Sequence, residues 1–199
     1  MFRGKREIET ILRALGEQLE AVSDEPVEFV VCGGSALNVL GFVQRATKDV
    51  DILAFIKRNT AGTISFTKNH PVGKKLSEAS RKVAKDFNLP EDWINTDPTS
   101  AVDFGLPDGL MERATIKQFG KSLIIHFLGR FDQIHFKLYA AADQGAGKHF
   151  DDLRALHPTA EELEQAARWS MTHDVSEDYR QTLKEMLDHM GYGDVAQRI

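Results

Sequence analysis

The stretch FVVCGGSALNVLGFVQRATKDVDILAF, residues 29–55, decides the fold of this chain. It continues an apolar run, residues 27–32, that is rich in β-branched and aromatic side chains and therefore predicts a buried strand. Gly33 and Gly34 interrupt the run, and a second apolar segment, residues 50–56, predicts another strand. The stretch is therefore expected to form two strands joined by a glycine turn and a short connecting segment.

The residues after the first strand have the composition of a phosphate-binding turn. Gly33 and Gly34 let the backbone approach a ligand closely, and Ser35 is the expected N-cap of a short helix that reaches Val39 and stops at Gly41. The N–H groups and dipole at the start of a helix favour an anion. Alternatively, the same residues form a tight strand-to-helix turn with no ligand.

Two carboxylates, Asp49 and Asp51, follow at a spacing of two residues. On a strand such residues share a face, with Cα atoms about 6.5 Å apart, so their oxygens can hold Mg²⁺ or Mn²⁺. The alternative is a pair of acids at an exposed strand end. Arg45 and Thr47 lie just ahead of the acids, and Arg45 either contacts a phosphate or pairs with one of the aspartates.

The rest of the chain predicts an α/β (α+β) core followed by helices. Apolar periodicity and turn residues predict the remaining elements, with helices at 6–22, 74–87, 131–142, 148–156, 159–172 and 176–190, and strands at 63–66, 114–119 and 122–128. Residues 89–110 are expected to be irregular and to border a site. We expect a core in residues 1–129 and a helical region in residues 130–199, because strands end near residue 129.

Composition narrows the classes of function. The chain has 199 residues, 42% hydrophobic, and a formal charge of −5, so no global field attracts nucleic acid or an anionic membrane. Its one cysteine, Cys32, forms no internal disulfide and is expected to be a buried strand residue in a reducing compartment. The charged N-terminus is not expected to be a secretion signal, and no apolar segment is long enough to span a bilayer. We expect a cytoplasmic protein.

The segment GGSALNVLGFVQRATKDVDIL resembles the signature of the nucleotidyltransferase superfamily with the DNA polymerase β type of fold. The form G-G-S/A followed by R-x-T-x-D-x-D is especially similar to the branch of AbiEii-type abortive-infection toxins and related bacterial proteins. That branch also carries a lysine in a K-x-x-A helix and an aspartate in a K-x-x-x-D-L-x-x-L helix. Lys137 in KLYAA and Asp152 in KHFDDLRAL match these motifs, so the resemblance covers residues 27–157.

Helical geometry places these two residues beside apolar stripes. At 100° per residue, Lys137 falls at the rim of the expected buried face of its helix. Asp152 is placed to reach a cleft and Asp151 to reach solvent. Ordinary charged residues flanking a buried face give the same pattern.

The resemblance implies Mg²⁺-dependent (or Mn²⁺-dependent) transfer of a nucleoside monophosphate from a nucleoside triphosphate to a hydroxyl group. It further implies an abortive-infection or toxin–antitoxin role, with a tRNA or other RNA, a protein or a small molecule as acceptor. The implied roles are nucleotide binding by Gly33, Gly34, Ser35, Arg45 and Thr47, metal binding by Asp49 and Asp51, and catalysis by Asp49, Asp51, Lys137 and Asp152.

The sequence departs from the superfamily in one respect. Members place a third carboxylate on a later strand, where it completes the metal site and serves as general base. Here that strand is expected to be SLIIHFLG, in which His126 is the one titratable side chain, while Asp103 precedes it in a loop. Either Asp152 supplies the base, or the fold serves as a non-catalytic nucleotide- or partner-binding module. A metal-dependent hydrolase has less support, since no His-rich site is present.

Overall fold

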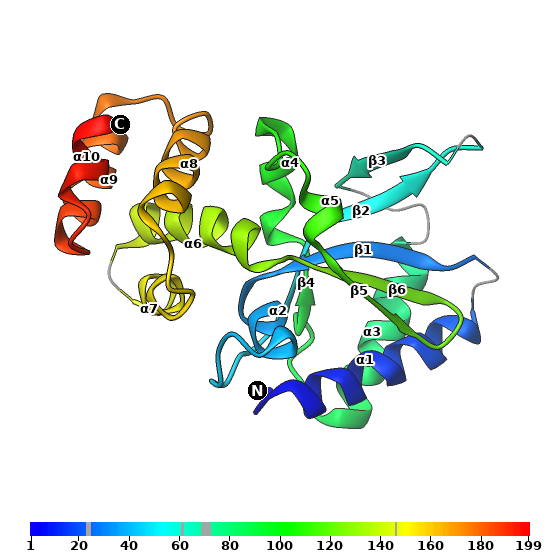
Figure 1. The fold of residues 1–199 in the computed structure, drawn as a ribbon. Helices are drawn as coiled ribbons and strands as arrows, with labels where there is room; N and C mark the ends of the chain where they lie inside the picture. The colour runs from blue at the N-terminus through cyan, green and yellow to red at the C-terminus, as the bar shows by residue number, and fades with distance from the viewer. Residues whose placement is uncertain (23–24, 61, 69–72, 146) are drawn as a thin grey trace. The chain divides into compact units, whose positions relative to one another are not determined.

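The computed structural model describes residues 1–22, 25–60, 62–68, 73–145 and 147–199. Its contacts divide the chain into two compact units. The sheet unit comprises Met1–Gly105 and Ala114–Leu128, and the helical unit comprises Leu106–Arg113 and Gly129–Ile199. The expected fold class is confirmed, because a mixed six-stranded sheet flanked by helices is followed by a helical C-terminal region (Figure 1).

The sheet unit is built around β1. Its strands are β1 (Val27–Cys32), β2 (Val50–Arg58), β3 (Ile64–Thr67), β4 (Ile94–Asn95), β5 (Thr115–Phe119) and β6 (Leu123–Phe127). They lie in the order β3-β2-β1-β6-β5, and β4 also pairs with β2. β1 runs antiparallel to β2 and parallel to β6. The helices of this unit are α1 (Lys5–Glu20), α2 (Gly33–Leu40), α3 (Gly73–Phe87), the 3-10 helix η1 (Asp97–Ser100) and α4 (Ala101–Phe104).

One face of the sheet carries the main apolar core. All six residues of β1 are buried, and alternate side chains such as Phe29 point to the face covered by α1 and α3 (Figure 1). Phe29 meets Phe55 of β2 edge to face, with ring centroids 6.0 Å apart. Apart from Glu28, the residues of β1 are apolar, and burial on both faces accounts for the lack of a regular alternation.

The opposite face of the sheet carries a charged cluster of Glu28, Arg58 and His126. The guanidinium of Arg58 donates two hydrogen bonds to the carboxylate of Glu28, at 2.9 and 2.6 Å. Nε2 of His126 lies 2.6 Å from Oε1 of the same carboxylate. Burial raises the pKa of Glu28, but the hydrogen bonds and charges of Arg58 and His126 outweigh burial, so its pKa lies below the ordinary value of 4.5.

The segment 89–110, expected to be irregular, contains β4, η1 and α4. These elements have two to four residues each, too few for a periodic pattern to be visible in the sequence. β4 exists through its pairing with β2, in which Val50 lies opposite Ile94 and Asp51 opposite Asn95. The expectation of an irregular segment was therefore wrong at the strand that adjoins Asp51.

The helical unit is organised around α6 (Arg130–Gln144). Its other helices are α5 (Leu110–Arg113), α7 (Lys148–Ala155), α8 (Ala160–Ser170), α9 (Glu177–His189) and α10 (Gly193–Arg198), of which α10 was not expected. The guanidinium of Arg130 donates to the carbonyls of Leu156 and His157 at the end of α7 and also binds the carboxylate of Glu162. Glu162 closes a capping box with Thr159 at the start of α8. One side chain of α6 thus fixes two helix termini.

A search of the described residues for membrane-spanning helices finds none with the required length and apolar character.

We predict that Glu28→Gln weakens the sheet unit in a pH-dependent manner. Because the pKa of Glu28 is lowered in the folded protein, its ionised form contributes stability above about pH 4.5, and this contribution is lost as the pH falls through the folded value. The difference in unfolding free energy between wild type and Glu28→Gln should therefore shrink below about pH 4.5. Urea unfolding followed by circular dichroism between about pH 3 and pH 5.5 measures it.

Glu78→Gln is the matched control, because Glu78 is exposed on α3. The difference in unfolding free energy between wild type and Glu78→Gln should not change with pH over the same range. If the difference for Glu28→Gln is equally independent of pH, the prediction is contradicted.

Candidate functional site

The turn between β1 and α2 is packed against the residues of the acidic motif. Gly33 has φ +72°, and a Cβ atom there would collide with Oδ2 of Asp51. A Cβ atom at Gly34 would lie 2.7 Å from the hydroxyl of Thr47 and 3.1 Å from a guanidinium nitrogen of Arg45. The structure therefore brings these five predicted residues together, and the two glycines are required because their neighbours occupy the space of a side chain.

Asn38 of α2 joins the helix to the loop that follows it. Its side-chain amide donates to the carbonyl of Gly34 and to the carbonyl of Arg45, each at 2.9 Å. Asn38 is buried. A buried amide that binds two backbone carbonyls fixes the loop relative to the helix start, because breaking either bond would leave a polar group unpaired.

The N-terminal segment holds Thr47 from the other side. Phe2 and Thr47 exchange two backbone hydrogen bonds, of 2.7 and 3.1 Å, in an isolated bridge. The Phe2 ring is fully buried and meets Trp93 edge to face at 6.2 Å. Trp93 directly precedes β4, so one aromatic contact supports both the loop that carries Thr47 and the strand beside Asp51.

Asp51 is held on its second side by Asn95. Nδ2 of Asn95 donates to Oδ1 of Asp51 at 3.1 Å, and Oδ1 of Asn95 accepts from the backbone N–H of Asp97 at 3.1 Å. Sequence reasoning missed Asn95. No motif surrounds it, and its role depends on a two-residue strand that forms only against β2.

Asp49 and Asp51 have the donor set of a site for a hard divalent cation. Asp49 directly precedes β2 and Asp51 is its second residue, and both are partly exposed. Carboxylate oxygens suit Mg²⁺, which usually takes one or two carboxylates and completes its shell with water and substrate phosphates. Among the described residues, no group of three or more His, Cys, Asp and Glu side chains is arranged to hold a metal.

Ser35 is not the N-cap of α2. The helix begins at Gly33, two residues earlier than expected, and the N-cap position belongs to Cys32. The hydroxyl of Ser35 is fully buried, and it has no hydrogen-bond partner within the described part of the chain. The expectation of an N-cap at Ser35 was wrong, because the first turn of α2 already includes Gly33 and Gly34 and Ser35 therefore lies inside the helix.

The two side chains considered in place of a third carboxylate are engaged elsewhere. His126 lies on β6 opposite Val30 and binds Glu28. Asp103 lies on α4 and forms an ion pair of 2.6 Å with Lys68. On the strand that adjoins Asp51, the residue paired with it is the amide Asn95.

Lys137 and Asp152 form a buried ion pair within the helical unit. Nζ of Lys137 lies 2.8 Å from Oδ2 of Asp152, and the side chains are 4% and 1% exposed. Nδ1 of His149 lies 3.4 Å from the same ammonium. Asp151 is exposed. A buried ion pair of this kind is costly to break, since removing one partner leaves an uncompensated charge.

No protein-family model, curated protein or solved structure matches this chain. The function is therefore argued from the residues of the two units.

We predict that Gly33→Ala destabilises the protein more than Gly41→Ala. Both glycines belong to the ends of α2 and have similar positive φ, +72° and +81°, so both substitutions carry a backbone strain of about 1–2 kcal/mol. At Gly41 nothing lies within 4 Å of the new Cβ atom, whereas at Gly33 the carboxylate of Asp51 must move. We expect an additional loss of about 1–3 kcal/mol for Gly33→Ala in urea unfolding. Equal losses for the two variants would refute the close packing.

We predict that Asp152→Ala lowers the unfolding free energy by about 3–5 kcal/mol, because Lys137 is left buried without its counter-ion. Asp151→Ala, at the exposed neighbouring position, should change it by less than about 0.5 kcal/mol. The double variant Lys137→Met/Asp152→Leu should lose much less than the sum of the losses of Lys137→Met and Asp152→Leu, because it removes both charges. Additive losses in this cycle would rule out a coupled pair.

Proposed function

We propose that this chain is a nucleotidyltransferase, which transfers a nucleoside monophosphate from a nucleoside triphosphate to a hydroxyl group and releases pyrophosphate. The observation that carries the proposal is the direct packing of Asp51, Arg45 and Thr47 against the glycine turn. A turn suited to phosphate and an acid suited to a metal thus occupy one place in the sheet unit. That combination is also what the resemblance to the superfamily predicts.

The proposed triphosphate site is the start of α2. Backbone N–H groups of the first turn and the helix dipole would attract the phosphate chain. The space beside Gly33 and Gly34 is taken by Asp51, Thr47 and Arg45, so the two glycines keep these side chains next to the helix start. The guanidinium of Arg45 borders Gly34, and its Nη1 donates to the carbonyl of Ala46 at 3.1 Å. Arginine is suited to this place because its planar group binds phosphate oxygens in pairs.

Asp49 and Asp51 would hold Mg²⁺ or Mn²⁺. A metal at these carboxylates neutralises charge on the phosphates and orients the pyrophosphate leaving group. The side-chain amide of Asn95 fixes the carboxylate of Asp51 and so maintains the orientation of one ligand.

Lys137 and Asp152, in the helical unit, are further proposed catalytic residues on the strength of the resemblance. Lys137 would neutralise phosphate charge, and Asp152 would orient its ammonium or assist proton transfer from the acceptor. Their 2.8 Å ion pair supports the orienting role. The acceptor class remains tRNA or other RNA, a protein or a small molecule, in a bacterial cytoplasmic setting related to abortive infection or toxin–antitoxin systems.

One observation favours a second candidate, a non-catalytic nucleotide- or partner-binding module. The strand beside Asp51 presents the amide of Asn95, which cannot take a proton from an acceptor hydroxyl as a carboxylate does. In this reading the glycine turn binds nucleotide and no transfer follows.

A labelling experiment separates the two candidates. The protein is incubated with each α-labelled nucleoside triphosphate, Mg²⁺ or Mn²⁺, total RNA and cell lysate, and label incorporation and pyrophosphate release are measured. Wild type should incorporate label, and Asp49→Asn and Asp51→Asn should each lower the rate at least about 100-fold, because each removes a proposed metal ligand. Asp86→Asn, an exposed position on α3, is the charge-matched control and should keep wild-type activity.

Nucleotide binding without incorporation into any acceptor pool would reject the transferase and support the binding module. Absence of nucleotide binding would reject the transferase and the nucleotide-binding form of the module.

A further inference from the structure

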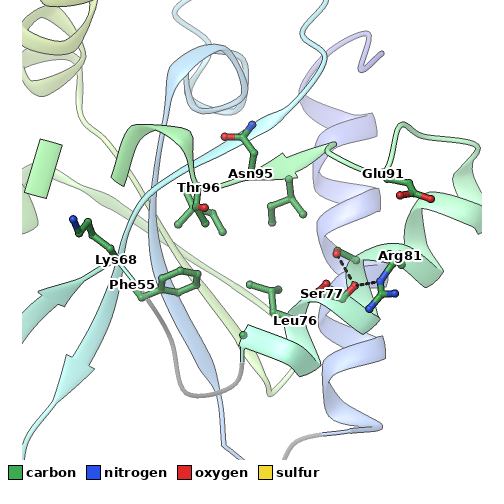
Figure 2. A pocket seen from close by; sticks show the side chains of 12 residues that line it. Phe55, Lys68, Leu76, Ser77, Arg81, Glu91, Asn95 and Thr96 are labelled. Atoms are coloured by element: carbon green, nitrogen blue, oxygen red, sulfur yellow. Dashed lines mark hydrogen bonds between the residues drawn. The ribbon is translucent and has the colours of Figure 1, made fainter. Parts of the chain in front are cut away.

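A cavity of about 390 Å³ opens at the outer edge of β2, between the positions where β3 and β4 pair with it (Figure 2). β4 pairs with residues 50–51 and β3 with residues 55–58, so the described strands leave residues 52–54 unpaired on this edge. Its volume lies in the range of small-molecule pockets. The cavity is distinct from the glycine turn, because Ile52, which lines it, follows Asp51 on the strand and points to the other face of the sheet.

The floor of the cavity is apolar. Ile52 and Phe55 of β2 and Leu76 of α3 line it, and all three are buried in the core of the sheet unit. Ile94 of β4 adds a partly buried wall. An apolar side chain of a ligand would be removed from water against this floor, which favours binding.

The rim of the cavity carries charges of both signs. Lys68 is already paired with Asp103 at 2.6 Å. Arg81 uses its Nε to donate to the carbonyl of Ser77, at 3.2 Å, and neither Arg81 nor Glu91 forms an ion pair within the described part of the chain. Figure 2 shows Arg81 and Glu91 on one side of the cavity and Phe55 on the other, with Leu76 between them. One cation and one anion thus lie on the rim beside the apolar floor.

We propose that this cavity binds an apolar α-amino acid. The guanidinium of Arg81 would bind the carboxylate, the carboxylate of Glu91 would bind the ammonium group, and the apolar side chain would cover Phe55 and Leu76. A triphosphate does not suit this rim, because Glu91 would repel it. A sugar does not suit the floor, because its hydroxyls would lose water without finding partners.

The site extends the proposed function without depending on it, because binding needs no nucleotide and no transfer. Asn95 lines the cavity and also donates to Asp51, so it connects the cavity with the acidic motif. The side-chain amide resonances of Asn95 therefore report occupancy of the cavity at a defined position.

The test compares three ligands that carry the same phenyl group on a two-carbon chain. L-phenylalanine carries both charges, 3-phenylpropionate lacks the ammonium group, and 2-phenylethylamine lacks the carboxylate. Titration calorimetry should show L-phenylalanine binding at least about tenfold more tightly than either analogue, because each charge contributes one charge-assisted hydrogen bond or more. In ¹H–¹⁵N spectra, L-phenylalanine should shift the side-chain amide of Asn95 and the backbone amides of Ser77 and Ile94.

Matched variants identify the two charges. With Arg81→Gln, L-phenylalanine should no longer bind more tightly than 2-phenylethylamine. With Glu91→Gln, L-phenylalanine should no longer bind more tightly than 3-phenylpropionate. Lys85→Gln and Glu78→Gln, exposed on the same helix as Arg81, should change affinity by less than about twofold. Ser77→Trp, at an exposed position on the rim, should fill the cavity and abolish binding.

Failure of L-phenylalanine and of L-leucine to bind would overturn the proposal. Equal affinities for L-phenylalanine and either analogue would also overturn it, as would spectral shifts confined to residues outside the cavity.

Discussion

The sheet unit depends on the contact between the carboxylate of Asp51 and the side-chain-free surface of Gly33. β1 ends at this glycine and α2 begins there, so the contact joins the central strand, the first helix and the acidic strand at one point. Asn38, Phe2 and Asn95 each fix one of the segments that meet there. A side chain at Gly33 would separate β2 from the helix start, so the glycine serves packing whether or not a ligand binds. Its presence alone is therefore weaker support for phosphate binding than the residues gathered around it.

Sequence patterns within a few residues were enough to predict those strands and helices whose start or end is set by adjacent residues. β1 has the predicted bounds, and Gly41 ends α2 in a left-handed conformation, because an apolar run and a C-cap glycine act within a few residues. Elements that exist only through distant pairing were not predictable in this way. β4 consists of two residues that pair with β2 more than forty positions earlier in the chain, and Asn95 gains its role solely from that pairing.

The partners of charged side chains were likewise not predictable where they come from distant strands. Sequence position identified His126 as the titratable group of its strand, but its partner Glu28 is 98 residues away and a third member, Arg58, comes from β2. The Lys137–Asp152 pair was easier to anticipate, because both residues flank the apolar stripes of consecutive helices. Helical periodicity gives the direction of a side chain, whereas a sheet brings together residues whose separation in sequence carries no signal.

The neutral partner of Asp51 bears on the chemistry of the candidate site. An amide that donates to a carboxylate stabilises its charge and fixes its orientation, whereas a third carboxylate at the same place would repel it. Asn95 thus fixes the orientation of the Asp51 carboxylate, but it contributes neither a further anionic ligand nor a base. In the proposed transferase, the charge of a metal held by Asp49 and Asp51 would be balanced by the phosphates of the substrate. Such a site would bind its metal together with nucleotide rather than alone, and a base for the acceptor would have to come from a residue other than Asn95.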